Sequence, residues 1–182
     1  MSKPVVAVLI VLALTSVTGV SHAVEGELTL GLGPGFTDLP ARGEEGQGGF
    51  GGGLYAEYRF NLFWGMTAGG YHSYQLSEGK SDLPGQSISS GWVGVIYNLD
   101  VATYVPFVTL GPTFFVSSPE LEDGQGRKVD AGARLGVGVD WRRYRHWSIG
   151  AEIDLHAFAT DLGNYPVYLT SMLRMNYHLD LF

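Results

Sequence analysis

The sequence predicts an all-β chain, an eight-stranded antiparallel up-and-down β-barrel, and three observations support this fold class. Apolar and polar residues alternate at every second position over long stretches. The links between these stretches are alternately long and short. Only 16% of the 182 residues are charged, whereas 27 are Gly, so the chain lacks the charged surface of an ordinary soluble domain.

The alternation is clearest in two neighbouring stretches, residues 129–141 and 147–159. In the first, every odd position is apolar and every even position is charged or Gly. In the second, the odd positions are again apolar, and the even set is dominated by Ser, Gly, Glu, Asp and His. Helical periodicity would mix the two sets, so both stretches are predicted to be strands.

Eight stretches of this kind follow one another, and each is long enough to cross a bilayer as a tilted strand. They cover approximately residues 25–36, 49–60, 64–76, 88–99, 103–116, 129–141, 147–159 and 166–182. The links at 38–48, 77–87 and 117–128 are long, and those at 61–63, 100–102 and 142–146 are short. An even number of strands lets the sheet close with both chain ends on one side, which is typical of outer-membrane barrels.

Composition excludes several classes of function. The chain has no Cys, so a disulfide scaffold, a Cys-ligated zinc site and a thiol nucleophile are ruled out. The formal net charge is -7 and no basic run is present, which argues against a nucleic-acid partner. With 45% hydrophobic residues the chain is not disordered.

Residues 1–23 are predicted to be a cleaved signal peptide, and residues 24–182 the outer membrane β-barrel domain. Lys3 provides a positive start, residues 5–14 are an unbroken apolar run, and small residues precede the expected cleavage after Ala23. The run is too short for a membrane-spanning helix. Without Cys, the mature chain is expected to carry no lipoprotein anchor.

The orientation of the two faces separates a membrane barrel from a soluble, ligand-binding barrel of lipocalin type. Aromatic residues cluster at both ends of the predicted strands, as expected where rings lie at membrane interfaces. Near the short turns they include Trp64, Tyr97, Trp141 and Trp147, and near the long links Phe36, Phe50, Phe114, Phe115 and Phe158. We therefore expect the apolar face to meet lipid, giving a transmembrane β-barrel, with aromatics packed in a soluble core as the alternative.

Three segments resemble small outer membrane β-barrels, the group that includes the outer membrane protein A transmembrane domain and its X-type and W-type relatives. They are Tyr104–Pro112, Gly132–Asp140 and the C-terminal Phe182. The resemblance implies location in the outer membrane of a Gram-negative cell envelope. It also implies lipid, lipopolysaccharide and the outer-membrane assembly machinery as partners. The C-terminus departs from the family in one respect. The apolar residues before Phe182 are shifted by one position from the alternation that would include Phe182, and a local bulge would correct this shift.

If the polar face lines the lumen, charged side chains from several strands share a narrow space. The predicted lumen charge network consists of Glu27, Glu57, Arg59, Arg134, Glu152, Asp154 and Arg174. Each unpaired charge out of water costs several kcal/mol, so we expect the three arginines to pair with the four carboxylates as a plug. No cofactor or metal is predicted, because Asp154, His156 and His178 fit a hydrogen-bonded filling better than a ligand set.

The predicted function is a structural or surface-interaction role, with any extracellular ligand bound through the long links, and no enzymatic activity. The alternative is a narrow W-type channel for small apolar solutes. A remote alternative is a lipid A-modifying acyl hydrolase, since His146, Ser148 and Glu152 could form a catalytic set. Those residues fall at a short, periplasmic turn, whereas lipid A lies in the outer leaflet.

The basic cluster Arg142, Arg143 and Arg145 is expected to meet lipid headgroups.

Overall fold

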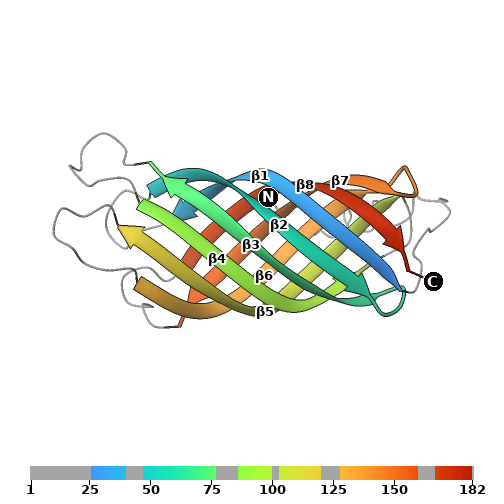
Figure 1. Ribbon diagram of the computed structural model, residues 1–182, viewed down its shortest axis with the longest axis horizontal. Coiled ribbons are helices and arrows are strands. Elements are labelled where there is room, and N and C mark those ends of the chain that lie inside the picture. The colour runs from blue at the N-terminus through green and yellow to red at the C-terminus, as the bar shows by residue number, and fades with distance from the viewer. Residues whose placement is uncertain are drawn as a thin grey trace, which may run out of the picture.

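The computed structural model describes residues 26–39, 47–76, 86–99, 103–119, 128–159 and 167–181. They form eight strands, which are β1 (Glu27–Leu39), β2 (Gln47–Arg59), β3 (Trp64–Gln75), β4 (Gln86–Asn98), β5 (Tyr104–Pro119), β6 (Lys128–Trp141), β7 (Trp147–Phe158) and β8 (Val167–Asp180). Each strand pairs antiparallel with the next, and β8 pairs with β1 to close the barrel (Figure 1). The predicted eight-stranded barrel is confirmed, with strand ends within a few residues of those expected.

Some sequence-based predictions lie outside the described residues. These are the signal peptide at residues 1–23, the C-terminal Phe182, and most of each long link. Within the part of the chain that the structure describes, no helix is long and apolar enough to span a membrane.

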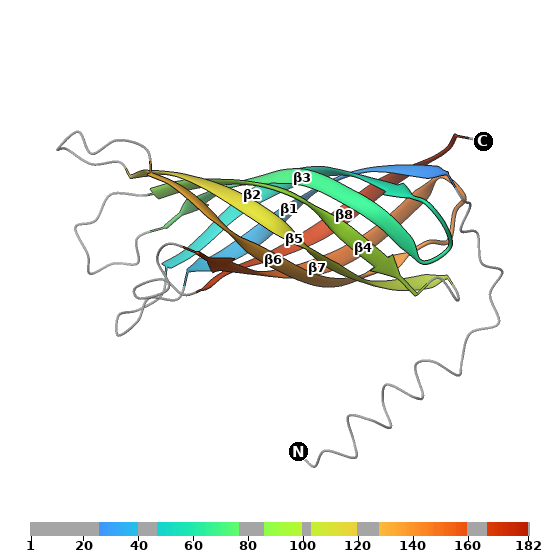
Figure 2. The ribbon, with the colours of Figure 1, turned by 90° about the horizontal axis from the view of Figure 1, so that it is seen from below.

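The short connections and the end of β8 lie at one end of the barrel, and the strands are inclined to its long axis (Figures 1 and 2). The β2–β3 turn shows why these connections are tight. The side-chain Oδ1 of Asn61 accepts hydrogen bonds from the backbone N–H groups of Phe63 and Trp64, both at 2.9 Å. An Asn side chain that replaces a backbone acceptor in this way favours a sharp reversal. We call this end the short-turn end and the opposite one the long-link end.

The two faces of each strand have opposite character. On the outside of β6 and β7, Leu135, Val137 and Ile153 are about half exposed, whereas Arg134 and Glu152, on the inner face, are nearly fully buried. Gly136 explains how the inner face accommodates its charges. A Cβ atom at this position would collide with the side-chain oxygens of Asp154, Thr109 and Glu152. Gly therefore leaves the space that the two carboxylates occupy.

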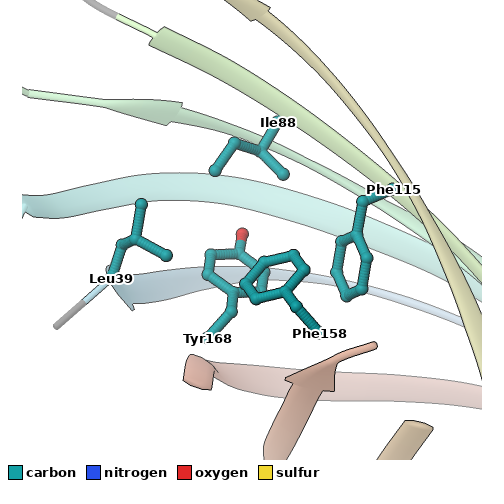
Figure 3. Close-up of a cluster of buried hydrophobic side chains, with 5 residues drawn as sticks. All are labelled: Leu39, Ile88, Phe115, Phe158 and Tyr168. Atoms are coloured by element: carbon teal, nitrogen blue, oxygen red, sulfur yellow. The ribbon is translucent and has the colours of Figure 1, made fainter. Parts of the chain in front are cut away.

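An apolar cluster of buried side chains lies inside the barrel near the long-link end (Figure 3). It contains Leu39, Ile88, Phe115, Phe158 and Tyr168. The rings of Phe115 and Phe158 pack with their centroids 4.5 Å apart. The prediction that these two rings belong to the outer aromatic belt is wrong, because they occupy inward positions of β5 and β7, with 2% and 8% exposure. Phe114, one position earlier, does face outward.

Strand β8 continues to Asp180 without a bulge. Its pairing with β1 keeps one register from Leu169, opposite Asp38, to Asp180, opposite Glu27. The local bulge that would correct the spacing to Phe182 is therefore not present up to Asp180, and Phe182 itself lies beyond the described residues.

The facing of the strands predicts the effect of a charge on the outer surface. Ala133 of β6 points outward and pairs with Ala157 of β7. We expect Ala133→Arg to lower the free energy of unfolding by about 2–4 kcal/mol, because a guanidinium near the bilayer midplane is poorly solvated. Denaturant titration in lipid vesicles measures this. Ala133→Leu is the control, and an unchanged stability for Ala133→Arg would contradict the assignment.

Candidate functional site

The centre of the lumen contains an ion-pair cluster around Arg174 of β8. Its guanidinium lies 2.6 Å from a carboxylate oxygen of Glu57, 3.0 Å from Glu152 and 3.3 Å from Asp140. The side chain is 1% exposed. Glu57 comes from β2, Asp140 from β6 and Glu152 from β7. Arg174 therefore connects β8 to β2 and β6, which are not its neighbours in the sheet, as well as to the adjacent β7.

Arg134 of β6 extends this cluster along the lumen. It contacts Glu152 at 2.6 Å and Asp154 at 2.8 Å, so Glu152 is shared by two arginines. Aromatic rings also lie against both guanidinium groups. Arg134 lies 4.4 Å from the ring centroid of Trp92, and Arg174 lies 4.4 Å from Tyr55 and 4.2 Å from Phe107. Cation–π contacts of this kind strengthen when water is excluded.

A second cluster lies at the short-turn end, around Glu27 of β1. Arg142 donates hydrogen bonds to both carboxylate oxygens of Glu27, and the one to Oε1 measures 3.0 Å. Arg59 is 3.9 Å from the same carboxylate, and Nδ1 of His178 is 3.1 Å from it. Glu27 is fully buried. A carboxylate at this depth is tolerated because three basic side chains surround it.

Arg142 corrects one prediction. The sequence placed it with Arg143 and Arg145 in a basic cluster at the lipid headgroups, but it points into the lumen and is 5% exposed. Position 142 continues the inward parity of Arg134 and Asp140, so the alternation of β6 contained the signal that would have identified it. Arg145 is exposed and pairs with Asp180 at 2.6 Å.

The structure brings together the seven predicted lumen residues in two groups. Glu57, Arg134, Glu152, Asp154 and Arg174 are in the central cluster, and Glu27 and Arg59 are in the cluster at the short-turn end. Sequence reasoning did not include Asp140 and Arg142 in the network. Pairing across the lumen depends on the register and tilt of the closed sheet, which the alternation pattern does not contain.

Next to Glu27, a chain of hydrogen bonds joins three polar side chains of β7 and β8. The Nε2 atom of His178 lies 2.9 Å from the Oγ atom of Ser148, which also accepts a hydrogen bond from Asn176 at 2.9 Å. A carboxylate only accepts hydrogen bonds, so its contact with Glu27 places a proton on Nδ1 of His178.

These contacts separate the residues of the hypothetical acyl hydrolase. Ser148 is bonded to His178 rather than to His146, whose Nδ1 lies 3.2 Å from the backbone oxygen of His178. Glu152 is bound by Arg134 and Arg174. Among the described residues, no group of three potential ligands is placed to hold a metal ion.

The predicted interface aromatics lie on the outer surface at the short-turn end. Trp64, Trp141 and Trp147 are exposed, and Tyr97 is half-buried beside Trp64, with the ring centroids 4.8 Å apart. Large amphipathic rings in this position are typical of a membrane-interface belt. The fifth residue of that prediction, Phe182, is outside the described residues.

A closed antiparallel barrel with an apolar exterior and a polar interior is typical of integral membrane β-barrels. The sequence also matches the family model described as "Outer membrane protein beta-barrel domain" over residues 7–173. The chain belongs to this family and is an outer membrane protein.

Solved structures of other small barrels share the fold. The attachment invasion locus protein Ail of Yersinia pestis is 18% identical, with a TM-score of 0.63 over 86% of this chain and 100% of that one. Neisserial surface protein A is 13% identical, with a TM-score of 0.67 and the same coverage of both chains. OprG from Pseudomonas aeruginosa is 12% identical, with a TM-score of 0.63 over 90% and 99% of the two chains.

Ail has also been solved in complex with the heparin analogue sucrose octasulfate. No curated protein of known function matches the sequence. At these identities the likeness to solved structures establishes the fold alone.

The central cluster predicts unequal effects for two arginines. Arg174→Met leaves three buried carboxylates with one fewer cation, so we expect the free energy of unfolding to fall by about 3–5 kcal/mol. Arg145→Met removes an exposed ion pair and is expected to cost less than about 1 kcal/mol. Urea unfolding of both variants in the same vesicles provides the comparison. Equal losses would contradict a central role for Arg174.

Proposed function

We propose that the protein is a non-conducting outer-membrane barrel whose lumen is plugged by side chains and whose biological role is structural or a surface interaction. The observation that carries the proposal is the burial of Arg134 and Arg174 among carboxylates in the middle of the lumen. An eight-stranded barrel has an interior just wide enough for its own side chains. A solute moving along the axis would have to separate these pairs.

Other layers of side chains support the plug on both sides. Toward the long-link end, Tyr55, Tyr71, Trp92 and Met172 form one apolar cluster, and the Phe115 cluster forms another. Toward the short-turn end, the Glu27 cluster fills the lumen. Opening a water-filled path would require several layers to rearrange together.

Electrical recording tests the plug. After reconstitution of the purified barrel in a planar bilayer, we expect no stable conductance steps, because the buried ion pairs lie between the two ends of the barrel and block the path of ions. A large bacterial porin in the same bilayer provides the positive control. Stable steps of porin size would refute the plugged lumen.

The composition of the long links supports a surface interaction with a basic partner. In this family the longer connections are extracellular. Residues 40–46, 77–85, 120–127 and 160–166 contain eight acidic and three basic residues. Ail was solved with a sulfated heparin analogue, but a net negative set of links would repel such an anion. We therefore propose a positively charged extracellular partner, such as a basic polypeptide.

Neutralising one link tests this partner. We expect the barrel in vesicles to bind polylysine, and the triple variant Glu120→Gln, Glu122→Gln, Asp123→Asn to bind roughly tenfold more weakly, since exposed ion pairs contribute about 0.5 kcal/mol each. Asp180→Asn, at the short-turn end, is the charge-loss control. Salt-independent binding, or equal binding by the triple variant, would count against the proposal.

A break in the sheet favours lateral transport of small apolar solutes as a second candidate function. In the β1–β8 ladder, Leu32 pairs with Met175 and Gly35 with Met172, without pairs between them. Pro34 lies in this interval and has no N–H to donate. An apolar groove of about 480 Å³ runs over the same place. Its lining includes the outward Phe36, Phe50 and Leu173 together with Glu152 and Met172, whose side chains are in the lumen.

Filling that groove distinguishes the two candidates. Leu173 lines it and Leu32 does not, and both are 60% exposed. If solutes pass through the wall, Leu173→Trp lowers uptake of a small apolar dye into vesicles and Leu32→Trp leaves it unchanged. If dye uptake into vesicles that contain the wild type or either variant equals uptake into protein-free vesicles, lateral transport is excluded.

We propose no catalytic role for Ser148. It is 3% exposed, and its hydroxyl group is engaged with His178 and Asn176. Release of a fatty acid from lipid A by the purified protein, abolished by Ser148→Ala, would overturn this view.

A further inference from the structure

An apolar groove of about 410 Å³ lies on the outer surface at the short-turn end. Its lining includes Trp141, Trp147, Ile149 and Met175, all of which face outward from β6, β7 and β8. Tyr144 and Arg143, from the β6–β7 turn, complete one side of it. The volume is within the range of small-molecule binding sites.

The β6–β7 turn places one cation at the end of this groove. Arg142 points inward to Glu27, and Arg145 is held by Asp180 through two hydrogen bonds of 3.0 and 2.6 Å. Arg143 is exposed, lines the groove, and has no ion pair with any residue in the described ranges. Arg143 is therefore a cation without an ion-pair partner among the described residues, and it adjoins the apolar groove.

The position of the groove in the membrane defines its environment. In the outer membrane protein β-barrel family, short turns face the periplasm. Trp141 and Trp147 belong to the aromatic belt, so the adjacent turn lies at the level of lipid headgroups. The apolar part of the groove then faces the acyl chains of the inner, phospholipid leaflet.

We propose that this groove is a binding site for an anionic glycerophospholipid of the periplasmic leaflet. The guanidinium of Arg143 binds the headgroup phosphate, and Trp147, Ile149 and Met175 contact an acyl chain. An anionic headgroup is favoured over a zwitterionic one, because the groove lining contains Arg143 to bind the phosphate but no carboxylate to pair with an ammonium group. Lipopolysaccharide is not the occupant, because it resides in the opposite leaflet.

The proposal is independent of the extracellular partner, since the groove and the long links are at opposite ends of the barrel. It also does not depend on whether solutes cross the wall, because the second groove lies elsewhere on the surface and shares none of the residues named for this one.

Native mass spectrometry of the full chain released from nanodiscs tests the proposal. The nanodiscs contain equal amounts of dioleoyl phosphatidylglycerol and dioleoyl phosphatidylcholine. We expect the wild type to retain phosphatidylglycerol preferentially, and Arg143→Gln to retain roughly fivefold less of it, which is the contribution of one basic residue near a membrane surface. Arg145→Gln, in the same turn but already paired with Asp180, should retain as much as the wild type.

A second pair of variants tests the acyl-chain part of the groove. Ile149→Trp fills the groove and should lower retention, whereas Ile153→Trp, on the same face of β7 but outside this groove, should not. Equal retention of the two lipids by the wild type would overturn the proposal. So would equal losses from Arg143→Gln and Arg145→Gln, which would indicate a general surface field. If millimolar inorganic phosphate displaces the lipid, the proposal is also overturned, because the groove is then a site for simple anions and not for a lipid.

Discussion

The requirement that the sheet close governs the rest of this structure. In hydrocarbon, an unpaired backbone N–H or C=O group costs several kcal/mol, so a sheet can cross a membrane only when its last strand pairs with its first. Here β8 meets β1 in one register, with Asp180 opposite Glu27. Closure with only eight strands makes the interior narrow, and every inward side chain must then pack or pair with others.

The charged lumen follows from that narrowness. With apolar side chains needed on the outside, the inward positions carry polar residues, and those that are ionised cannot reach bulk water. Arg174 meets three carboxylates, and Glu152 meets two arginines, so no single strand pair accounts for the network. Replacing buried ion pairs with apolar side chains is often neutral or stabilising, so the pairs do not need to be the main source of stability. In the proposed plugged barrel, they are the element that would keep the lumen closed to solutes.

The period-two alternation was enough to predict the strands and to sort their residues into two faces. The aromatic residues at the strand ends were needed to predict that the apolar face points outward, because a soluble barrel shows the same alternation. It was not enough for Phe115 and Phe158. They are apolar residues at inward positions, where they cap the lumen. We assigned them to the outer belt because they are aromatic and lie near strand ends. Their positions in the alternation are those of the inward residues of β5 and β7, which assigns them to the interior. Arg142 was misplaced for a related reason, since it lies beyond the end of β6 but keeps the inward parity of Asp140.

The pairings inside the lumen were the least predictable part. Arg174 and Glu57 are far apart in sequence and come from strands on either side of β1, and their contact depends on how far the strands are staggered at closure. Alternation fixes the side on which a residue lies but not its height along the axis. The same limit applies to Ser148, whose partner is His178 from the next strand rather than the nearby His146.

The most direct test of the central claim is a double-mutant cycle across the lumen, with Arg174→Met and Glu57→Gln measured singly and together by unfolding in vesicles. If the two side chains form a buried pair that keeps the lumen closed, their effects are non-additive, with a coupling energy of about 1 kcal/mol or more. Additive effects would contradict the account, because they would mean that the two residues do not interact in the folded barrel.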